Sequence, residues 1–152
     1  EKYGVTFQLK ADTLETYSIV DPSRFNQALV NLLSNAAKFS PKGEAVMIEI
    51  TEQANDRIQI SVSDKGPGIP TSFRDKIFQR FAQADGSATR MAGGSGLGLN
   101  ITKSIVESLG GEITYDSVEG HGATFRLNFP TCTSSTKQGD ADGKRPEQDT
   151  IC

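Results

Sequence analysis

The sequence predicts an α/β sandwich, with a mixed, largely antiparallel sheet and helices on one face. Strand and helix signals alternate along residues 1–130. Two long segments, 21–38 and 97–109, carry apolar side chains at helical spacing, so each helix has one face to bury. Shorter segments alternate apolar and polar residues, as strands with one covered face do. Helices and a sheet that each bury one face pack together in layers.

The first 43 residues predict two short strands and a long helix. The alternating apolar residues are Val5, Phe7 and Leu9 in the first strand, and Tyr17 and Ile19 in the second. Asp21 followed by Pro22 is typical of a helix start, with Asp21 as the N-cap. We expect this helix to run to about Lys38, because the Ser-Pro-Lys-Gly segment at 40–43 breaks it.

A β-hairpin and a short helix are predicted next. Apolar side chains alternate over 46–50 and over 58–62, and the residues between, 53–56, predict a hairpin turn. A Gly/Pro loop follows at 66–70, and spaced apolar residues over 73–78 indicate a short helix.

A second long helix and a closing hairpin complete the pattern. Residues 82–96 are rich in Gly, Ala and Ser and predict a mobile loop. Apolar residues four apart over 97–109 predict a helix, which Gly110-Gly111 ends. Residues 113–129 predict two strands joined by a turn at 119–122.

Composition and charge exclude several classes of protein. Of the 152 residues, 36% are hydrophobic and 23% charged, so we expect a globular domain over 1–130. Residues 131–152 are nearly all polar and predict a disordered tail or a linker. The net charge of −3 argues against nucleic acid as the main partner, because phosphate binding needs a basic face. No apolar run approaches the roughly 20 residues of a membrane span, so we expect no membrane contact by this domain.

The cysteines add a prediction about the compartment. Cys132 and Cys152 both lie in the polar C-terminal stretch, where neither can form a disulfide that crosslinks the core. The absence of a disulfide framework fits a reducing, cytoplasmic setting. The full-length parent could still be anchored in a membrane.

Three polar residues on the first long helix are candidates for phosphate and metal binding. Asn31 and Asn35 are one turn apart and share a face, and Lys38 lies about one turn further. An amide oxygen is a hard ligand that Mg²⁺ accepts, and an ammonium group suits phosphate. Taken alone, the pattern is more typical of a solvated polar stripe.

Three other segments could also contact a nucleotide. Asp64 precedes Gly66 and Gly68, so its carboxylate can accept hydrogen bonds from a ligand that approaches the backbone closely, although a plain turn is as compatible. Segment 93–99 opens a helix, where backbone N–H groups bind phosphate, but a flexible hinge fits equally well. His121, the only histidine, lies in a glycine turn and is expected to be solvated rather than catalytic.

In this order, the clusters resemble the catalytic ATP-binding domain of sensor histidine kinases. The wider superfamily includes type II topoisomerases, mismatch-repair ATPases and a heat-shock chaperone. The resemblance covers 1–130 and implies the Bergerat-type ATP-binding fold. The segments similar to the N, G1, F and G2 boxes and to the final glycine motif are 31–40, 64–70, 78–81, 94–99 and 120–124.

The resemblance implies ATP and Mg²⁺ as ligands, with a role for each matching residue. Asn35 would supply an oxygen to Mg²⁺, and Asn31 and Lys38 would lie against the phosphates. Asp64 would accept a hydrogen bond from the adenine amino group. The residues expected around the base are Phe39, Gly66, Gly68, Ile69 and Thr124. The residues expected around the phosphates are Arg80, Arg90, Gly94, Ser95, Gly96, Leu97, Gly98 and Leu99.

The resemblance also favours a kinase over a hydrolase. Water-attacking relatives place a glutamate where Asn31 stands, and an amide cannot take a proton from water. The domain would position Mg-ATP for γ-phosphoryl transfer to a histidine on a separate dimerisation domain of the same protein. A response regulator receiver domain would be a further partner, and the isolated domain would be a monomer.

Two other functions stay open at this point. One is a serine protein kinase of the anti-sigma type, which the long 31–39 motif and the F box disfavour. The other is a non-catalytic nucleotide-binding docking module. Intact Asn35, Asp64 and the three lid glycines argue against it.

Overall fold

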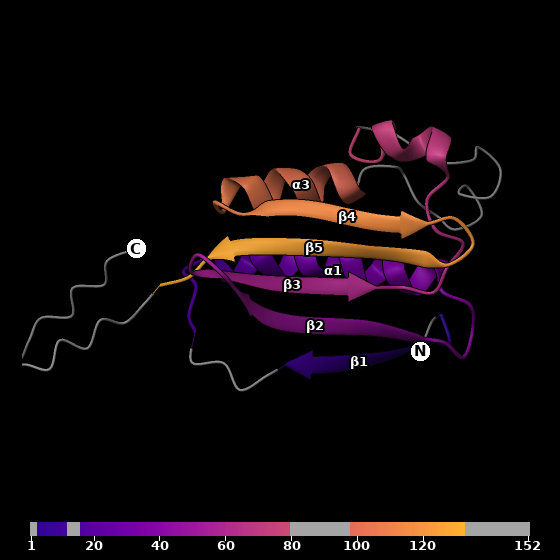
Figure 1. Ribbon diagram of the computed structural model, residues 1–152, viewed down its shortest axis with the longest axis horizontal. Helices are drawn as coiled ribbons and strands as arrows, with labels where there is room; N and C mark the ends of the chain where they lie inside the picture. The colour runs from indigo at the N-terminus through magenta and orange to yellow at the C-terminus, as the bar shows by residue number, and fades with distance from the viewer. Residues whose placement is uncertain (1–2, 12–15, 80–97, 133–152) are drawn as a thin grey trace, which may run out of the picture.

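The computed structural model describes residues 3–11, 16–79 and 98–132. A five-stranded sheet has the order β1-β2-β3-β5-β4, and α1 lies behind its central strands in Figure 1. Only β1 and β2 are parallel, and the other neighbours are antiparallel. The elements are β1 (Thr6–Ala11), α1 (Pro22–Phe39), β2 (Ala45–Gln53), β3 (Arg57–Ser63), the 3₁₀ helix η1 (Thr71–Lys76), α3 (Gly98–Ser108), β4 (Glu112–Val118) and β5 (Gly122–Pro130).

The long helix α1 begins where the sequence predicts. The Asp21 carboxylate accepts hydrogen bonds from the backbone N–H groups of Ser23 and Arg24, at 2.9 and 3.2 Å. These groups have no partner inside the helix, so the cap stabilises its first turn. The helix ends at Phe39, where the Ser40 N–H donates to Ala36 O at 3.0 Å.

The predicted strand at Tyr17 and Ile19 is wrong. Tyr17 forms only an isolated bridge to Cys132, and residues 18–20 are not in a strand. Both sides of β5 are already paired, with β3 and with β4. The chain at Tyr17 can therefore pair only beyond the end of β5, and alternation alone does not create a strand.

The hairpin between β2 and β3 confirms the predicted turn. Asn55 and Asp56 both have positive φ, at 64° and 54°. Asn and Asp tolerate this left-handed conformation, and they are two of the three residues, 54–56, that connect the strands. The turn fixes the register, with Gln53 opposite Arg57.

One face of the sheet forms the core together with both helices. The register aligns Ile60 with Leu127 and Val62 with Phe125, and all four side chains are buried. They pack in one cluster with residues of α1 and α3, such as Leu32, and α3 also contacts α1 and β4. The opposite face carries charged pairs, including Lys10–Glu49 and Arg126–Asp116. The sheet therefore has helices on one face, as predicted.

The second half of the chain follows the predicted order. The short helix is the 3₁₀ helix η1. After α3, Gly110 has a φ of +78° and the Gly111 N–H donates to Val106 O at 2.9 Å, which is a glycine helix end of the expected kind. The expected loop 82–96 lies outside the described residues, and so does the expected tail 131–152 except for its first two residues. The N–H groups of Thr131 and Cys132 donate to Asp56 O at 2.8 Å and Tyr17 O at 2.6 Å.

Two further findings concern membrane spans and the cysteines. None of the helices in the described part of the chain is long and apolar enough to cross a membrane. Cys132, the last described residue, is disulfide-bonded. The cysteines therefore no longer argue for a reducing setting.

Candidate nucleotide-binding site

The polar residues of α1 lie beside the described start of α3. Asn31, Asn35 and Lys38 are each half-buried. A Cβ atom built on Gly98 would lie 3.7 Å from Nδ2 of Asn35. The buried residues Ala28, Leu32 and Ala36 fix the rotation of α1 against the sheet. The packing of α1 thus brings the N-box asparagine next to the G2-box end of α3.

Asp64 is held at the end of β3 by backbone hydrogen bonds. Its Oδ1 accepts from the N–H groups of Gly66 at 2.9 Å and Ala123 at 3.3 Å. Its own N–H donates to Ala123 O at 2.9 Å. Among the described residues, none donates a hydrogen bond to Oδ2. One carboxylate oxygen is therefore fixed by the protein, and the other is available to a ligand.

The environment of Asp64 changes its acidity. Burial raises the pKa of this carboxyl above its ordinary value, because desolvation disfavours the charged form. The hydrogen bonds from Gly66 and Ala123 act in the opposite direction but do not cancel the effect of burial on the pKa. A half-buried carboxylate with one oxygen that accepts no hydrogen bond would gain from a ligand donor.

Two glycines let the loop after β3 approach other backbone closely. A Cβ on Gly66 would lie 2.5 Å from Phe39 O, at the end of α1. A Cβ on Gly68 would lie 2.5 Å from Val118 O, at the end of β4, and Gly68 has a φ of +73°. The loop 64–70 is thus packed between α1 and the β4–β5 hairpin.

The residues expected around the base occupy different environments. Phe39 is 43% exposed, so its ring is accessible beside the loop. Ile69 is only 9% exposed and already packs in the core cluster. Thr124 lies opposite Ser63, and their hydroxyl oxygens are 2.9 Å apart in a hydrogen bond. Thr124 is therefore fixed one residue away from the register position of Asp64.

Several predicted site residues have no described position. They are Arg80, Arg90, Gly94, Ser95, Gly96 and Leu97. Gly98 and Leu99 are described in α3, and Leu99 packs against the core cluster. Of the expected site, the structure therefore describes the loop 64–70, which would hold the base, and α1, which would hold the phosphates. The two meet where Gly66 approaches Phe39 O.

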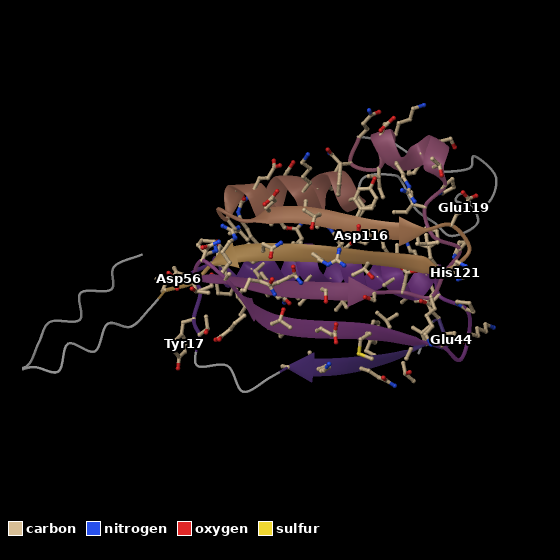
Figure 2. All side chains as sticks on the ribbon, in the orientation of Figure 1. Tyr17, Glu44, Asp56, Asp116, Glu119 and His121 are labelled. Carbon is tan, nitrogen blue, oxygen red and sulfur yellow. The ribbon has the colours of Figure 1, made fainter. Side chains whose placement is uncertain are left out.

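A hollow of about 180 Å³ lies beside Asp64 at the β4–β5 hairpin. Its lining includes Ser117, His121 and Thr124. Figure 2 shows His121 and Glu119 at the same end of the molecule, and His121 is exposed in the turn. Within residues 3–11, 16–79 and 98–132, no group of three or more His, Cys, Asp or Glu side chains could hold a metal ion.

The sequence analysis missed Ser117. Its Oγ accepts from the Ile69 N–H at 2.7 Å and donates to Gly122 O at 3.0 Å. The alternation of β4 places Ser117 on the covered face with Ile113 and Tyr115, but the pattern does not say which segment packs there. Only the packing of the loop against β4 identifies it.

Comparisons with known proteins show the family of this chain. Residues 20–133 match the family described as histidine kinase-, DNA gyrase B-, and HSP90-like ATPase. Sensor histidine kinase WalK of Bacillus subtilis is 41% identical over 117 residues, which are 76% of this chain and 19% of WalK. The structure of the mycobacterial sensor histidine kinase MprB has a TM-score of 0.71 and 30% identity, and the match covers 84% of this chain and 83% of that one. Full-length ShkA, in complex with AMPPNP, has a TM-score of 0.73 and 29% identity, covering 86% of this chain and 26% of ShkA.

The chain belongs to the histidine kinase-, DNA gyrase B- and HSP90-like ATPase family. Within it, the chain is an ATP-binding catalytic domain of two-component sensor histidine kinases. The predicted fold class and domain type are confirmed by these matches. The chain spans about a fifth of the length of WalK.

Proposed function

We propose that this domain positions Mg-ATP for transfer of the γ-phosphoryl group to a histidine on a separate dimerisation domain of the full-length protein. The observation that carries the proposal is the placement of Asn35 beside Gly98, because it joins the amide-bearing face of α1 to the start of α3. The names of the relatives WalK and MprB support a sensor histidine kinase.

The base end of the nucleotide is assigned to Asp64. Its Oδ2 is available while Oδ1 is held by two backbone N–H groups, so the carboxylate is preorganised to accept one further hydrogen bond. The adenine amino group is such a donor. Thr124, fixed by Ser63, and the accessible ring of Phe39 would complete this end.

The phosphate end is assigned to α1. Asn31, Asn35 and Lys38 share one half-buried face, which suits phosphate oxygens and a hard cation. We assign a Mg²⁺ ligand to the Asn35 side-chain oxygen. When bound, the ion would neutralise charge on the phosphates. Arg80 and Arg90 remain proposed phosphate contacts.

Asn31 favours phosphoryl transfer over hydrolysis. An amide side chain cannot act as a general base, so this position cannot activate water for attack on ATP. A kinase needs positioning and charge neutralisation instead. We therefore expect the transferred group to reach a protein acceptor, with a response regulator receiver domain as the subsequent partner.

The proposal is tested by supplying the acceptor in trans. The chain is incubated with γ-labelled ATP, Mg²⁺ and the helical dimerisation domain of its own parent protein. We expect acid-labile, base-stable label on that domain, as phosphohistidine gives. Acid-stable label would indicate a serine kinase instead. No label, although ATP binds, would contradict the kinase proposal.

A further inference from the structure

We propose that Ser117 is a positioning residue of the nucleotide site, whose hydroxyl group holds the loop 64–70 against the β4–β5 hairpin. The inference rests on the proposed function, because it assumes that this loop contacts the base. Ser117 is not assigned to contact the nucleotide. It would act through Asp64 and Ile69.

Both hydrogen-bonding functions of the Ser117 hydroxyl are used inside the protein. It accepts from the Ile69 N–H at 2.7 Å and donates to Gly122 O at 3.0 Å. A hydroxyl has one hydrogen to donate, and here that hydrogen goes to the hairpin. The hydrogen bond to Gly122 O orients the Ser117 hydroxyl, so that its oxygen accepts from the Ile69 N–H and holds the loop.

The other links between the loop and the hairpin have backbone N–H donors, and one of them ends on a side-chain oxygen, Oδ1 of Asp64. The Gly120 N–H donates to Pro67 O at 2.7 Å, and Asp64 and Ala123 exchange hydrogen bonds at the base of the loop. Between loop 64–70 and strand β4, Ser117 supplies the side-chain hydrogen bond found among the described residues. Substitution of Ser117 therefore removes a link that backbone atoms do not replace.

The contact is tight, so its loss must move the loop. A Cβ on Gly68 would lie 3.0 Å from Ser117 Oγ and 2.5 Å from Val118 O. Ile69 is 9% exposed, which places its N–H in a poorly solvated environment. Without the hydroxyl, that N–H loses its partner, and an unpaired buried donor is costly. The loop would shift to recover a hydrogen bond, and the base contacts would shift with it.

Ser117 also ties η1 to the same point. Its carbonyl oxygen accepts from Nη2 of Arg74 at 2.5 Å, and the Tyr115 hydroxyl donates to Arg74 O at 3.1 Å. The main chain of Ser117 thus holds the segment after the loop, while its side chain holds the loop itself. A substitution of the Ser117 side chain therefore removes the contact with the loop and keeps the contact with η1, because the backbone carbonyl is unchanged.

The test compares ADP binding by calorimetry for the wild-type chain and three variants, well below their melting temperatures. We expect Ser117→Ala to weaken binding by about tenfold, as expected for the loss of one hydrogen bond. Ser117→Thr keeps the hydroxyl and should bind within about threefold of wild type. Ser108→Ala is the matched control, since the Ser108 hydroxyl donates to Ile105 O at 2.7 Å at the end of α3, away from the loop. Its affinity should be unchanged.

A second readout locates the effect. Amide exchange at Ile69 should accelerate in Ser117→Ala and stay slow in Ser108→Ala. If wild type and Ser117→Ala bind ADP equally, while the melting temperature falls, Ser117 is merely structural and the inference is wrong. Ser117→Thr binding as weakly as Ser117→Ala would also overturn it. If the wild-type chain binds no ADP, the proposed function fails together with this inference.

Discussion

A Cβ atom on Gly66 would lie 2.5 Å from the carbonyl oxygen of Phe39, so the loop after β3 meets the end of α1 backbone to backbone. No side chain separates the two segments at this point. The distance between the α1 amides and the Asp64 carboxylate is therefore set by a contact that only glycine permits. This junction joins the two ends of the proposed nucleotide site.

Gly66→Ala should damage both stability and binding. The methyl group would overlap the Phe39 carbonyl and should cost about 1–3 kcal/mol of unfolding free energy, as overpacking does. We expect ATP affinity to fall by more than tenfold, because Asp64 and α1 move apart. Gly43→Ala is the control, since it has no neighbour within 4 Å but a φ of +86°. It should lose only about 1–2 kcal/mol and bind ATP normally. Normal ATP binding by Gly66→Ala would contradict the role of the junction.

Asp64→Asn should separate stability from function. Burial raises the folded-state pKa above 3.8, so the folded protein holds this proton more tightly than the unfolded chain. The free energy of unfolding therefore falls as pH rises from the unfolded-state pKa of Asp64 to its folded-state pKa. This loss of stability is complete at neutral pH. Asparagine keeps an oxygen for Gly66 and Ala123 without the charge. We expect the nucleotide-free variant to melt no lower than wild type at pH 7, yet to lose ATP binding.

The pH dependence provides the check on that prediction. The difference in melting temperature between Asp64→Asn and wild type should shrink as the pH approaches 3.8, where the wild-type carboxyl is increasingly protonated. A constant difference across this range would mean that the charge of Asp64 has no part in stability.

The same carboxylate predicts a preference for adenine over guanine. Asp64 Oδ2 can accept from an amino group, whereas it would face the carbonyl oxygen of guanine and remain unpaired. An unpaired buried polar group costs about 1–3 kcal/mol, which is roughly tenfold to hundredfold in affinity. Calorimetry with ATP and GTP measures this ratio directly. Equal affinities would remove Asp64 from base recognition.

The sequence predicted those parts of the fold that local signals determine. The Asp21 cap, the turn at Asn55 and Asp56, and the glycine end after α3 each follow from one or two residues, and the structure has all three. The predicted strand at Tyr17 does not form because a strand needs an unpaired strand edge beside it, and both edges of β5 are already paired. Alternation along the chain carries no information about which strand edges are occupied.

The site was predictable to a similar degree. Asn31 and Asn35 share a face by helical geometry, and the structure places Asn35 beside Gly98. The roles of Asn35 and Asp64 toward a nucleotide stay predictions. Ser117 was not predictable, because its importance comes from a contact with Ile69, 48 residues earlier in the chain. The β4 alternation places it on the face of Ile113 and Tyr115, but not next to any particular loop.

Asn35→Ala should lower phosphoryl transfer strongly while leaving the fold intact. Asn35 is half-buried and lies beside Gly98, outside the apolar cluster that holds α1 to the sheet. The loss of its amide should therefore change the melting temperature of the nucleotide-free protein little, and transfer in trans should drop by at least tenfold, the scale of one lost polar contact to a charged group. Asn26→Ala is the matched control on the exposed face of α1 and should change neither. A large loss of melting temperature in Asn35→Ala would favour a structural role.

The chain by itself should not acquire a stable phosphoryl group from ATP. His121 is its only histidine, and the β4–β5 turn fixes it, with its N–H donating to Val118 O at 2.9 Å. In-line transfer needs the acceptor nitrogen within about 3–3.5 Å of the γ-phosphorus. The proposed phosphate contacts lie on α1, whereas the hollow beside His121 is lined by hairpin residues and Asp64. We therefore expect His121 to lie near the base end and out of reach of the γ-phosphoryl group.

Incubation with γ-labelled ATP and Mg²⁺ should leave the chain unlabelled, and His121→Ala should still support transfer to the dimerisation domain in trans. Acid-labile label that disappears in His121→Ala would show that the acceptor lies in this chain.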